Sequence, residues 1–495
     1  METQTDTDVL IVGSGPVGLF LANECVRRGL RWRLVELRPG QTSYSKALAV
    51  MPRTLEILDM AGLVAPFLEI ANRVTEVAVI SHRRRLARLH FAPEQSPDQF
   101  IAMIPQDVTE RLLVQALERR GGVIEYDTRF LSARQEHDHV IAEVEHRGER
   151  STITASYVVG CDGPHSTIRH LLDLPFEGAQ YDATYLLADV ESDTALPADE
   201  MQLCPSEMGP VAIFPMSQTR RRVLASINEM EGPLPSLELV RRILDQRGPG
   251  GLDIQSMSWS SYFRIHHRQV GRLRVGRIFI AGDAGHIHSP VGGQGMNTGL
   301  QDIWNLVWKL DLAVQGLASE ELLDSYSSER RPVIRQVIET TDRLTRAMTT
   351  PSRLAQILRD AIIPMVSRLA PFQHAFVQRM SELDVAYPGS PIVEGEGRRY
   401  FDPSMTGGDG IRNRYLLLLP LGADASLIDS ARQFVEARPS LVELRQGRET
   451  DLLLVRPDGY VAYDEKHPRG DATWKAIGKL IDRGVPRQPA HAVRR

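Results

Sequence analysis

The sequence is poor in cysteine. Its 495 residues include only Cys25, Cys161 and Cys204, at spacings that match neither a disulfide framework nor a metal site. Disulfides are therefore not expected, and a reducing compartment fits. The polar N-terminus has no apolar signal-peptide segment, and the apolar run Leu416–Leu419 is far too short to cross a bilayer. We expect a cytoplasmic protein without a membrane partner.

The sequence also lacks a long block of basic residues. Its formal net charge is −5, so nucleic acid is not an expected partner. The short clusters Arg83–Arg85 and Arg220–Arg222 are interpreted as solvated faces rather than docking patches for an anionic cofactor. His286 and His288 do not have the spacing of a metal site, and no bound metal is expected.

A glycine-rich loop, GSGPVG at 13–18, follows a β-branched strand at 8–12 and precedes a helical pattern. Gly13 makes the tight turn, and Gly15 lets the backbone approach a pyrophosphate. Gly18 permits close packing of the helix on the strand. Together with the flanking elements, this loop predicts a dinucleotide site.

A second strand, at 32–35, ends in Glu36. A carboxylate at this place can accept hydrogen bonds from both hydroxyls of a ribose. The combination strengthens the prediction of a dinucleotide, but it does not separate FAD from NAD.

The stretch RVGRIFIAGDAGHIHSPVGGQGMNTGLQD at 274–302 carries another strong pattern. An apolar strand at 278–281 ends abruptly at Gly282-Asp283, a glycine-rich loop follows, and a helix begins near Met296. Glycines and a helix N-terminus allow backbone N–H groups to approach a ligand. Asp283 cannot hold a phosphate directly, because like charges repel, but it suits hydroxyls such as those of a ribityl chain.

Three further segments carry polar residues near expected turns. Pro105-Gln106-Asp107 opens a helix that includes Arg111, and Gly160-Cys161-Asp162-Gly163 follows a β-branched strand. Lys46 and Arg53 precede another helix. Taken singly, these segments are ordinary turns or capped helices. In order with the two glycine-rich segments, they favour a cofactor site.

The remaining chain predicts a second sheet and a C-terminal unit. Short alternating runs between 176 and 274 indicate an inserted antiparallel sheet with a helix at 237–246, and we expect the hairpin at 74–93 to join it. An amphipathic helical stretch at 351–380 is expected to be a packing or dimer element. A linker at 387–410, rich in proline and glycine, separates a C-terminal unit with strands at 415–419 and 452–455, a turn at 456–459, and helices at 427–437 and 473–482.

These segments resemble the class A flavoprotein monooxygenases, the para-hydroxybenzoate hydroxylase-like family, in its phenol and polyketide hydroxylase branch. The resemblance covers roughly the whole chain. It implies an α/β fold: a Rossmann-like FAD-binding domain, an inserted antiparallel-sheet substrate domain and a thioredoxin-like C-terminal domain without a CxxC motif. The expected boundaries are 1–175 and 275–400 for the FAD-binding domain, with 74–100 joining the substrate domain, 176–274 for the substrate domain, and 401–495 for the C-terminal domain.

The family's activity supplies the functional expectation. It implies tightly bound FAD, transient NADPH or NADH, and O₂ as co-substrate. Through a flavin C4a-hydroperoxide, one oxygen atom would pass to a small phenolic or polycyclic aromatic substrate, and we expect a homodimer. Two alternatives stay open: an antibiotic-inactivating or Baeyer–Villiger enzyme of the same fold, and a flavin-binding protein without oxygenase activity.

The resemblance also assigns residues to roles. The loop beside the flavin ring would provide Pro290, Gly292, Gly293 and Gly295. Cofactor contacts would come from Gly13, Gly15, Pro16, Gly18, Glu36, Lys46, Arg53, Gln106, Arg111, Asp162, Gly282, Asp283, Gly295, Met296 and Asn297. Lys46 stands where the family usually has arginine, so it keeps the charge but lacks the planar fork. The candidates for the substrate wall are Phe214, Met216, Phe263 and Arg268.

Overall fold

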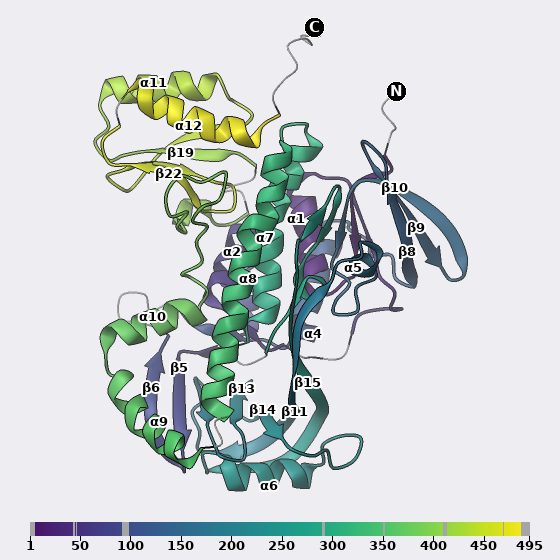
Figure 1. The fold of residues 1–495 in the computed structure, drawn as a ribbon, viewed down its shortest axis with the longest axis vertical. Coiled ribbons are helices and arrows are strands. Elements are labelled where there is room, and N and C mark those ends of the chain that lie inside the picture. Colours follow the sequence, from purple (N-terminus) through teal and green to yellow (C-terminus); the bar gives the residue numbers. More distant parts are fainter. Residues whose placement is uncertain are drawn as a thin grey trace.

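The computed structural model describes residues 5–42, 45, 47–91, 99–289, 293–349, 352–408, 413–468 and 470–486. Figure 1 shows a sheet covered by helices in the upper right, a second sheet at the bottom, and a smaller α/β unit at the upper left. The long helix α8 (Glu320–Thr349) runs through the middle and lies beside all three.

The first sheet is built around parallel strands. Strand β1 (Thr7–Val12) is buried along its whole length and pairs in parallel with β10 (Glu149–Gly160) and β2 (Trp32–Val35), while β10 pairs in parallel with β17 (Ile278–Ile280). Parallel strands that are buried on both faces read as continuous apolar runs, which is how these strands could be predicted. The same sheet also contains β16 (Arg274–Val275), β8 (Thr128–Gln135) and β9 (Val140–His146).

Helices cover this sheet, which confirms the predicted α/β class. Helix α1 (Pro16–Arg28) packs against α4 (Gln106–Glu118) and α7 (Gly295–Val314). It ends at Gly29, whose φ of 74° is the left-handed conformation that glycine adopts without a steric cost. The shorter helices of this part are α2 (Pro52–Met60), α3 (Ala65–Ile70) and α5 (Thr167–Leu171).

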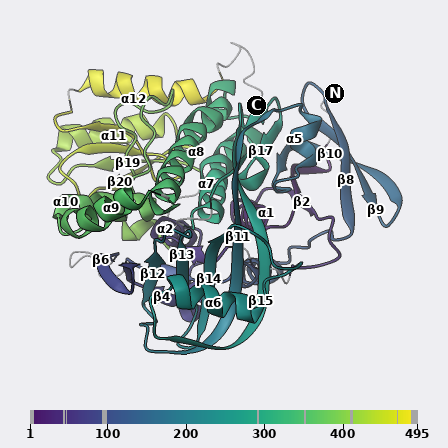
Figure 2. The ribbon, with the colours of Figure 1, turned by 60° about the horizontal axis from the view of Figure 1, so that its bottom comes forward.

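The second sheet has the strand order β18-β15-β11-β14-β13-β12-β5-β6. Its two long strands, β11 (Phe176–Thr194) and β15 (Leu252–Val270), pair antiparallel and extend from the first sheet to the lower part of the molecule (Figure 2). Helix α6 (Leu237–Arg247) packs on one face. The strands are β5 (Glu76–Ser81), β6 (Arg84–His90), β11 (Phe176–Thr194), β12 (Glu200–Cys204), β13 (Val211–Pro215), β14 (Arg220–Ile227), β15 (Leu252–Val270) and β18 (His286–Ile287). The hairpin β5–β6 joins this sheet through the parallel pair β5–β12.

A small third sheet and a C-terminal sheet complete the strands. The third sheet has the order β3 (Ala49–Val50), β7 (Ile101–Met103), β4 (Asn72–Val74). The C-terminal sheet has the order β20-β19-β21-β22, and only β19 and β20 run parallel within it. Its elements are β19 (Tyr415–Leu419), α11 (Ala425–Glu436), β20 (Val442–Gln446), β21 (Leu452–Val455), β22 (Val461–Glu465) and α12 (Asp471–Gly484).

The helical stretch predicted at 351–380 contains two helices, α9 (Arg353–Val366) and α10 (Ala370–Met380). In its described part, 387–408, the segment predicted as a linker packs against the rest of the chain: Tyr387 and Ile392 are buried, and Arg399 forms a β-bridge with Tyr460 of the C-terminal unit. No helix within the described ranges combines the length and the apolar character needed to cross a membrane.

The interpretation of Arg220–Arg222 as a solvated cluster is wrong for two of its three residues. Arg221 and Arg222 are buried. Arg221 donates hydrogen bonds to backbone carbonyl oxygens, including that of Leu196 at 3.2 Å. Arg222 forms a buried ion pair with Asp189, with Nε and Oδ1 2.6 Å apart. The Arg222 guanidinium therefore has the charged partner that a buried charge requires, whereas Arg221 relies on carbonyl oxygens and its Nε has no partner among the described residues.

A cluster of buried charges joins α8 to the C-terminal unit. The carboxylate of Glu329 accepts hydrogen bonds from Arg456 at 2.5 and 2.9 Å and from Lys309 at 2.9 Å, and all three side chains are fully buried. Burial alone would raise the pKa of Glu329, but Arg456 and Lys309 outweigh that effect and hold the pKa well below its ordinary value.

Replacing Glu329 with glutamine should destabilise the protein by about 3–5 kcal/mol, because Arg456 and Lys309 would lose the charge that compensates their burial. Denaturant unfolding at neutral pH measures this loss. The depressed pKa means that Glu329 stabilises the fold above its unfolded-state pKa of about 4.3 and that this contribution is lost as the pH falls. The wild type should therefore lose stability on acidification more steeply than Glu329→Gln.

Glu339→Gln is the matched control on the same helix. Its side chain is 55% exposed and lies 3.7 Å from Arg343, so its loss should change the unfolding free energy by less than about 0.5 kcal/mol. Equal effects of the two substitutions would contradict the role assigned to the buried cluster.

Candidate functional site

Three loops meet at one edge of the first sheet. Val12 at the end of β1 is paired with Gly160 at the end of β10, and Gly160 is paired with Ile280 at the end of β17. Because the strands are parallel, the loops that follow them emerge side by side. Three segments that are far apart in the sequence, around residues 13–18, 161–163 and 281–284, are thereby brought together.

Glycine is required where these loops touch. A Cβ at Gly13 would lie 2.5 Å from the carbonyl oxygen of Cys161, and a Cβ at Gly18 would lie 2.0 Å from that of Gly13. On α7, a Cβ at Gly299 would lie 2.7 Å from the side chain of Val17. These separations are shorter than real contacts, so any larger residue would push the segments apart.

Gly15 stands in the opposite situation. A Cβ added there would meet nothing within 4 Å, and its φ of −70° and ψ of 179° are open to any residue. Gly15 is the N-cap of α1 and Pro16 is the first helical residue, so no side chain caps the N–H groups of the first turn. Open space at the N-terminus of a 13-residue helix is a cradle for an anion such as a pyrophosphate.

Glu36 lies beside this cradle with two partners that the sequence did not indicate. Its carboxylate accepts hydrogen bonds from the backbone N–H and the hydroxyl of Ser14, at 2.7 and 2.8 Å, and from Arg38 Nε at 2.9 Å. Burial raises the pKa of Glu36, but the bonds from Arg38 and Ser14 outweigh it and lower the pKa below its ordinary value. The ionised carboxylate is therefore ready to accept hydroxyl donors.

Gln106 connects α4 to the segment that precedes α2. Its side-chain oxygen accepts a hydrogen bond from the Ala47 N–H at 3.1 Å, and its amide donates to Glu110 at 3.0 Å. Burial raises the pKa of Glu110 to about 7. Arg111, one position further along α4, is exposed.

Asn297 fixes the start of α7. It accepts a hydrogen bond from the Met51 N–H at 2.9 Å and donates to the carbonyl oxygens of Ala49, at 2.9 Å, and Gly293, at 2.8 Å. Gly293 has a φ of 66°, which only glycine adopts easily. All three partners are backbone groups, so the Asn297 side chain positions two loops and leaves the helix N-terminus to a ligand.

Gly295 and the buried Met296 form the first residues of α7. A Cβ at Gly295 would contact the imidazole of His288 at 3.8 Å. Burial, with a smaller contribution from His286, lowers the pKa of His288 to about 4, so this imidazole is neutral at physiological pH. Lys46, Pro290 and Gly292 lie outside the described residues.

A buried carboxylate, Asp302, holds the Gly-Asp turn in place. One of its oxygens accepts the Gly282 N–H at 3.1 Å and lies 2.7 Å from His286 Nε2, and the other accepts Arg330 Nε at 2.8 Å. Burial alone would raise the pKa of Asp302, but His286 and Arg330 lower it below its ordinary value. Asp283, the second residue of the 3-10 turn η1 (Gly282–Ala284), is exposed beside this network.

Two further predicted cofactor residues, Asp162 and Arg53, also have defined structural partners. One oxygen of Asp162 accepts the N–H groups of Thr167, at 2.7 Å, and Ile168, at 3.2 Å, at the start of α5, while the other is buried without a partner among the described residues. Arg53 is fully buried and faces the C-terminal unit, where it donates to the Asp458 carbonyl oxygen at 3.4 Å and lies 5.2 Å from the Tyr460 ring. These contacts assign Arg53 to the junction with that unit.

The face of the second sheet opposite α6 carries the substrate-wall candidates. Phe214 is partly buried there with Tyr185, and the Phe263 ring stacks on Tyr185 with centroids 5.8 Å apart. Met216 and Phe214 also pack against one neighbouring apolar cluster. Arg268 lies away from this group, where β15 pairs with β18.

This face is turned toward the loop at Ala47, as one contact shows. The strand register places Asp189 opposite Arg222, and alternation puts both on the same side as Tyr185. Arg222 reaches the carbonyl oxygen of Ala47 at 3.2 Å. The Tyr185 hydroxyl is buried without a hydrogen-bond partner in the described part of the chain, and its burial raises the pKa of the phenol. The sequence did not single out Tyr185, because a tyrosine in an alternating strand does not differ from a core residue.

Comparison with known proteins identifies the family. Residues 6–341 match the model of the FAD binding domain family. The 6-methylpretetramide 4-monooxygenase of Streptomyces rimosus is 35% identical over 400 residues, which cover 79% of this chain and 71% of that protein. A rifampicin monooxygenase of Streptomyces venezuelae is 30% identical over 470 residues, 92% of this chain and 95% of that protein.

The fold agrees with this assignment. The structure of the anhydrotetracycline hydroxylase OxyS from Streptomyces rimosus superposes with a TM-score of 0.77 and 29% identity, and the match covers 97% of this chain and 99% of that one. With the glycine loops, the anion cradle and the acidic residue at the end of β2 all in register, the chain belongs to the FAD binding domain family and is a flavin-dependent aromatic monooxygenase.

Proposed function

We propose that this enzyme hydroxylates a phenolic or polycyclic, polyketide-like aromatic compound, with NADPH or NADH as the reductant and O₂ as the co-substrate. The observation that carries the proposal is the aromatic face of β11, β13 and β15, which is turned toward the loop at Ala47. Bound FAD supplies the electron transfer and the activation of oxygen. The protein's own side chains bind, orient and shield the reacting molecules.

The residues of the sheet edge fit an FAD molecule. The space at Gly15 and the uncapped N-terminus of α1 suit its pyrophosphate, and the ionised Glu36 suits the hydroxyls of its adenosine ribose. The Asp162 oxygen that has no partner within the described ranges, and the exposed carboxylate of Asp283, supply acceptors near the other two loops. The N-terminus of α7 at Gly295 presents backbone donors, and the neutral His288 adds no competing charge.

The substrate wall combines apolar area with a few polar groups. Phe214, Phe263 and Trp259 provide aromatic surface, and Tyr185 provides a buried hydroxyl that has no partner among the described residues. A buried donor of this kind is costly unless a ligand oxygen accepts its hydrogen bond, by about 1–3 kcal/mol. An aromatic compound that carries a hydroxyl or carbonyl oxygen would satisfy it.

We further propose that the enzyme is a homodimer and that residues 401–495 form a thioredoxin-like module. The sheet order β20-β19-β21-β22 with helices α11 and α12 supports the second point. Because no cysteine follows Cys204, this module would serve assembly and stability rather than thiol chemistry.

The first test addresses cofactor binding. Gly15→Val should leave the apoprotein folded, because the added side chain meets no protein atom, but it should fill the pyrophosphate cradle and reduce bound FAD at least about tenfold. The FAD-to-protein absorbance ratio after gel filtration measures this. Gly271→Val, at an exposed glycine that also has open space, is the control. Normal FAD content in Gly15→Val would refute the assigned cradle.

The second test addresses the reaction. Phenols and oxygenated polycyclic aromatics should accelerate flavin reduction by NADPH or NADH, and they should convert reductant consumption from hydrogen peroxide release into product formation. Mass spectrometry with labelled dioxygen should find one labelled oxygen atom in the product. If peroxide is the sole product across a broad panel, the enzyme is not a hydroxylase of these compounds.

The third test addresses the wall. Tyr185→Phe should raise the KM for an oxygenated aromatic substrate roughly 5–10-fold, since one neutral hydrogen bond is lost, with little change in FAD content. Tyr262→Phe is the matched control, because Tyr262 lies on the neighbouring strand and packs on the face covered by α6. Indistinguishable KM values for the two variants would remove Tyr185 from the substrate site.

A further inference from the structure

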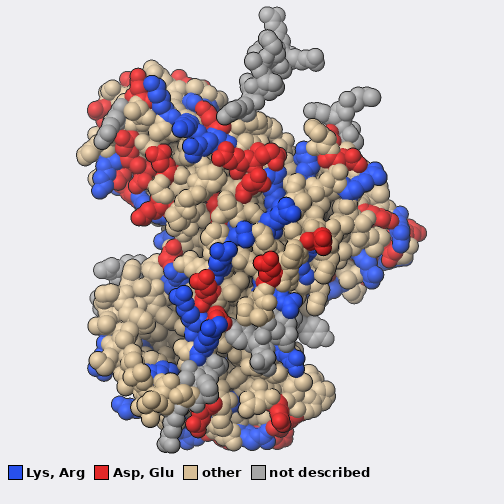
Figure 3. Space-filling view, in the orientation of Figure 1, with Lys and Arg blue, Asp and Glu red and all other residues tan. Residues whose placement is uncertain are grey.

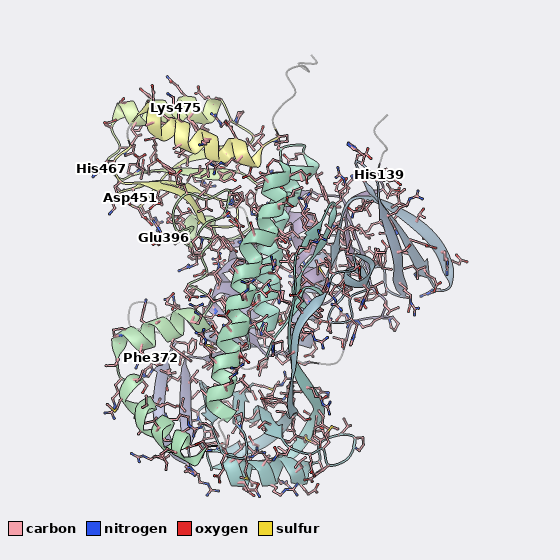
Figure 4. The ribbon with its side chains drawn as sticks, viewed as in Figure 1. His139, Phe372, Glu396, Asp451, His467 and Lys475 are labelled. Carbon is pink, nitrogen blue, oxygen red and sulfur yellow. The ribbon has the colours of Figure 1, made fainter. Side chains whose placement is uncertain are left out.

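Helices α9 and α10 expose an apolar surface to solvent, which we name the α9–α10 face. Figure 3 shows it as a largely tan area at the lower left, and Figure 4 places Phe372 on α10 in the same region. The side chains that define the face are between 40% and 76% exposed: Leu354, Ile357, Leu358, Ile362, Met365, Leu369 and Phe372.

The polarity of α9 is inverted relative to an ordinary surface helix. Its polar residues point inward: Gln356 is buried, and Asp360 accepts a hydrogen bond from the Ser81 hydroxyl at 2.6 Å and one from Arg359 at 2.9 Å. A solvated helix has its apolar stripe on the core side and its polar residues outside. Because α9 instead exposes its apolar stripe to solvent, that stripe is available to pack against another protein surface.

The size of the α9–α10 face exceeds what a monomer usually exposes. Seven large side chains, each exposing on the order of 100 Å², give roughly 700 Å² of apolar surface. Monomers rarely show contiguous patches above a few hundred Å², whereas a stable interface takes about 800 Å² from each partner. The face is therefore as large as one half of a dimer interface.

The charge of the face selects the kind of partner. Among the exposed residues from 354 to 375, only Arg368 and His374 carry polar side chains. An anionic lipid surface attracts helices whose polar side is rich in lysine and arginine, and a charged protein partner would require complementary charges here. A surface that is apolar apart from these two side chains is complementary to itself, as the isologous interface of a twofold dimer requires.

We propose that the α9–α10 face is the interface between two copies of this chain, related by a twofold axis. The inference rests on the homodimer of the proposed function and deepens it by naming the surface. Each copy would bury the leucine, isoleucine and methionine side chains of α9 against those of its partner.

The interface would also brace the cofactor site through the end of α10. Gln294, the N-cap of α7, donates to the Arg379 carbonyl oxygen at 3.3 Å, and the Arg53 N–H donates to that of Ser381 at 3.2 Å. Glu382 accepts hydrogen bonds from Thr298, at 3.4 Å, and from Gln301 on α7. Fixing α10 between two copies therefore limits the motion of the helix whose N-terminus faces the flavin.

The test uses the full-length enzyme with FAD bound. Sedimentation velocity should show a dimer for the wild type and a monomer for the double variant Leu358→Glu, Met365→Glu. Burying two unpaired carboxylates per copy should raise the dimer dissociation constant by about 100-fold or more. The matched control is Met230→Glu, Leu421→Glu, which changes two similarly exposed apolar residues elsewhere and should remain dimeric. FAD should dissociate faster from the monomeric variant than from this control.

Cross-linking gives an independent measurement that does not depend on destabilising charges. The native cysteines are buried, so a single added cysteine can report on its own surroundings. Ile362→Cys or Met365→Cys should form a disulfide-linked dimer under mild oxidation, whereas Leu421→Cys should not.

Each outcome separates the interface from the activity. A dimer that cross-links at Leu421→Cys but at neither α9 position overturns the interface and keeps the homodimer, whereas a monomeric wild type overturns both. A dimeric wild type that cross-links through α9 but forms no hydroxylated product supports the interface and refutes the proposed reaction.

Discussion

The buried carboxylate of Asp302 is the contact on which the geometry of the cofactor edge depends. Its oxygens form hydrogen bonds with the Gly282 N–H of the Gly-Asp turn, with the His286 ring and with the Arg330 guanidinium. Asp302 lies on α7, whereas Arg330 lies on α8. A carboxylate with several charge-assisted bonds in a dry site has little freedom to move. The turn is thus held by two long helices, which keeps the loops around a flavin in place without relying on the loops themselves.

Two neighbouring residues of α8 form buried ion pairs with two different parts of the molecule. Arg330 turns to Asp302, whereas Glu329 turns to Arg456 of the C-terminal unit, and both ion pairs are fully buried. Breaking either pair would leave a charge without compensation, so both parts of the molecule hold the same turn of α8. The C-terminal unit, which contains no cysteine, therefore has a physical role: it shields the buried charges of Glu329, Lys309 and Arg456 from water.

The sequence predicted those features that depend on local sterics, and it missed those that depend on distant partners. Gly18 and the strand ends follow from short-range packing, and Gly13, although its Cβ would meet the distant Cys161, belongs to the same glycine spacing, so all of them leave a readable pattern. The burial of Arg222 and Arg53 depends on Asp189 and on the C-terminal turn, which no local pattern indicates. Helix α8 continues through Pro332, although a proline in a helix interior normally ends or kinks the helix. The buried ion pairs of Glu329 and Arg330 anchor the turn that precedes this proline, and these partners are also distant in the sequence.

The second sheet shows how contacts that the sequence does not reveal can determine which substrates are selected. Tyr185 and Asp189 point to the same side and are separated by roughly 13 Å along the strand, with the apolar Leu187 between them. Asp189 is already neutralised by Arg222, so it gains little from a ligand, whereas the Tyr185 hydroxyl has no partner in the part of the chain that the structure describes. On the proposed function, an aromatic compound with an oxygen at the Tyr185 end recovers the cost of that buried hydroxyl, and an unsubstituted hydrocarbon does not. Selectivity for oxygenated aromatics would thus come from one unsatisfied donor rather than from the apolar area, which any flat hydrophobic molecule could cover.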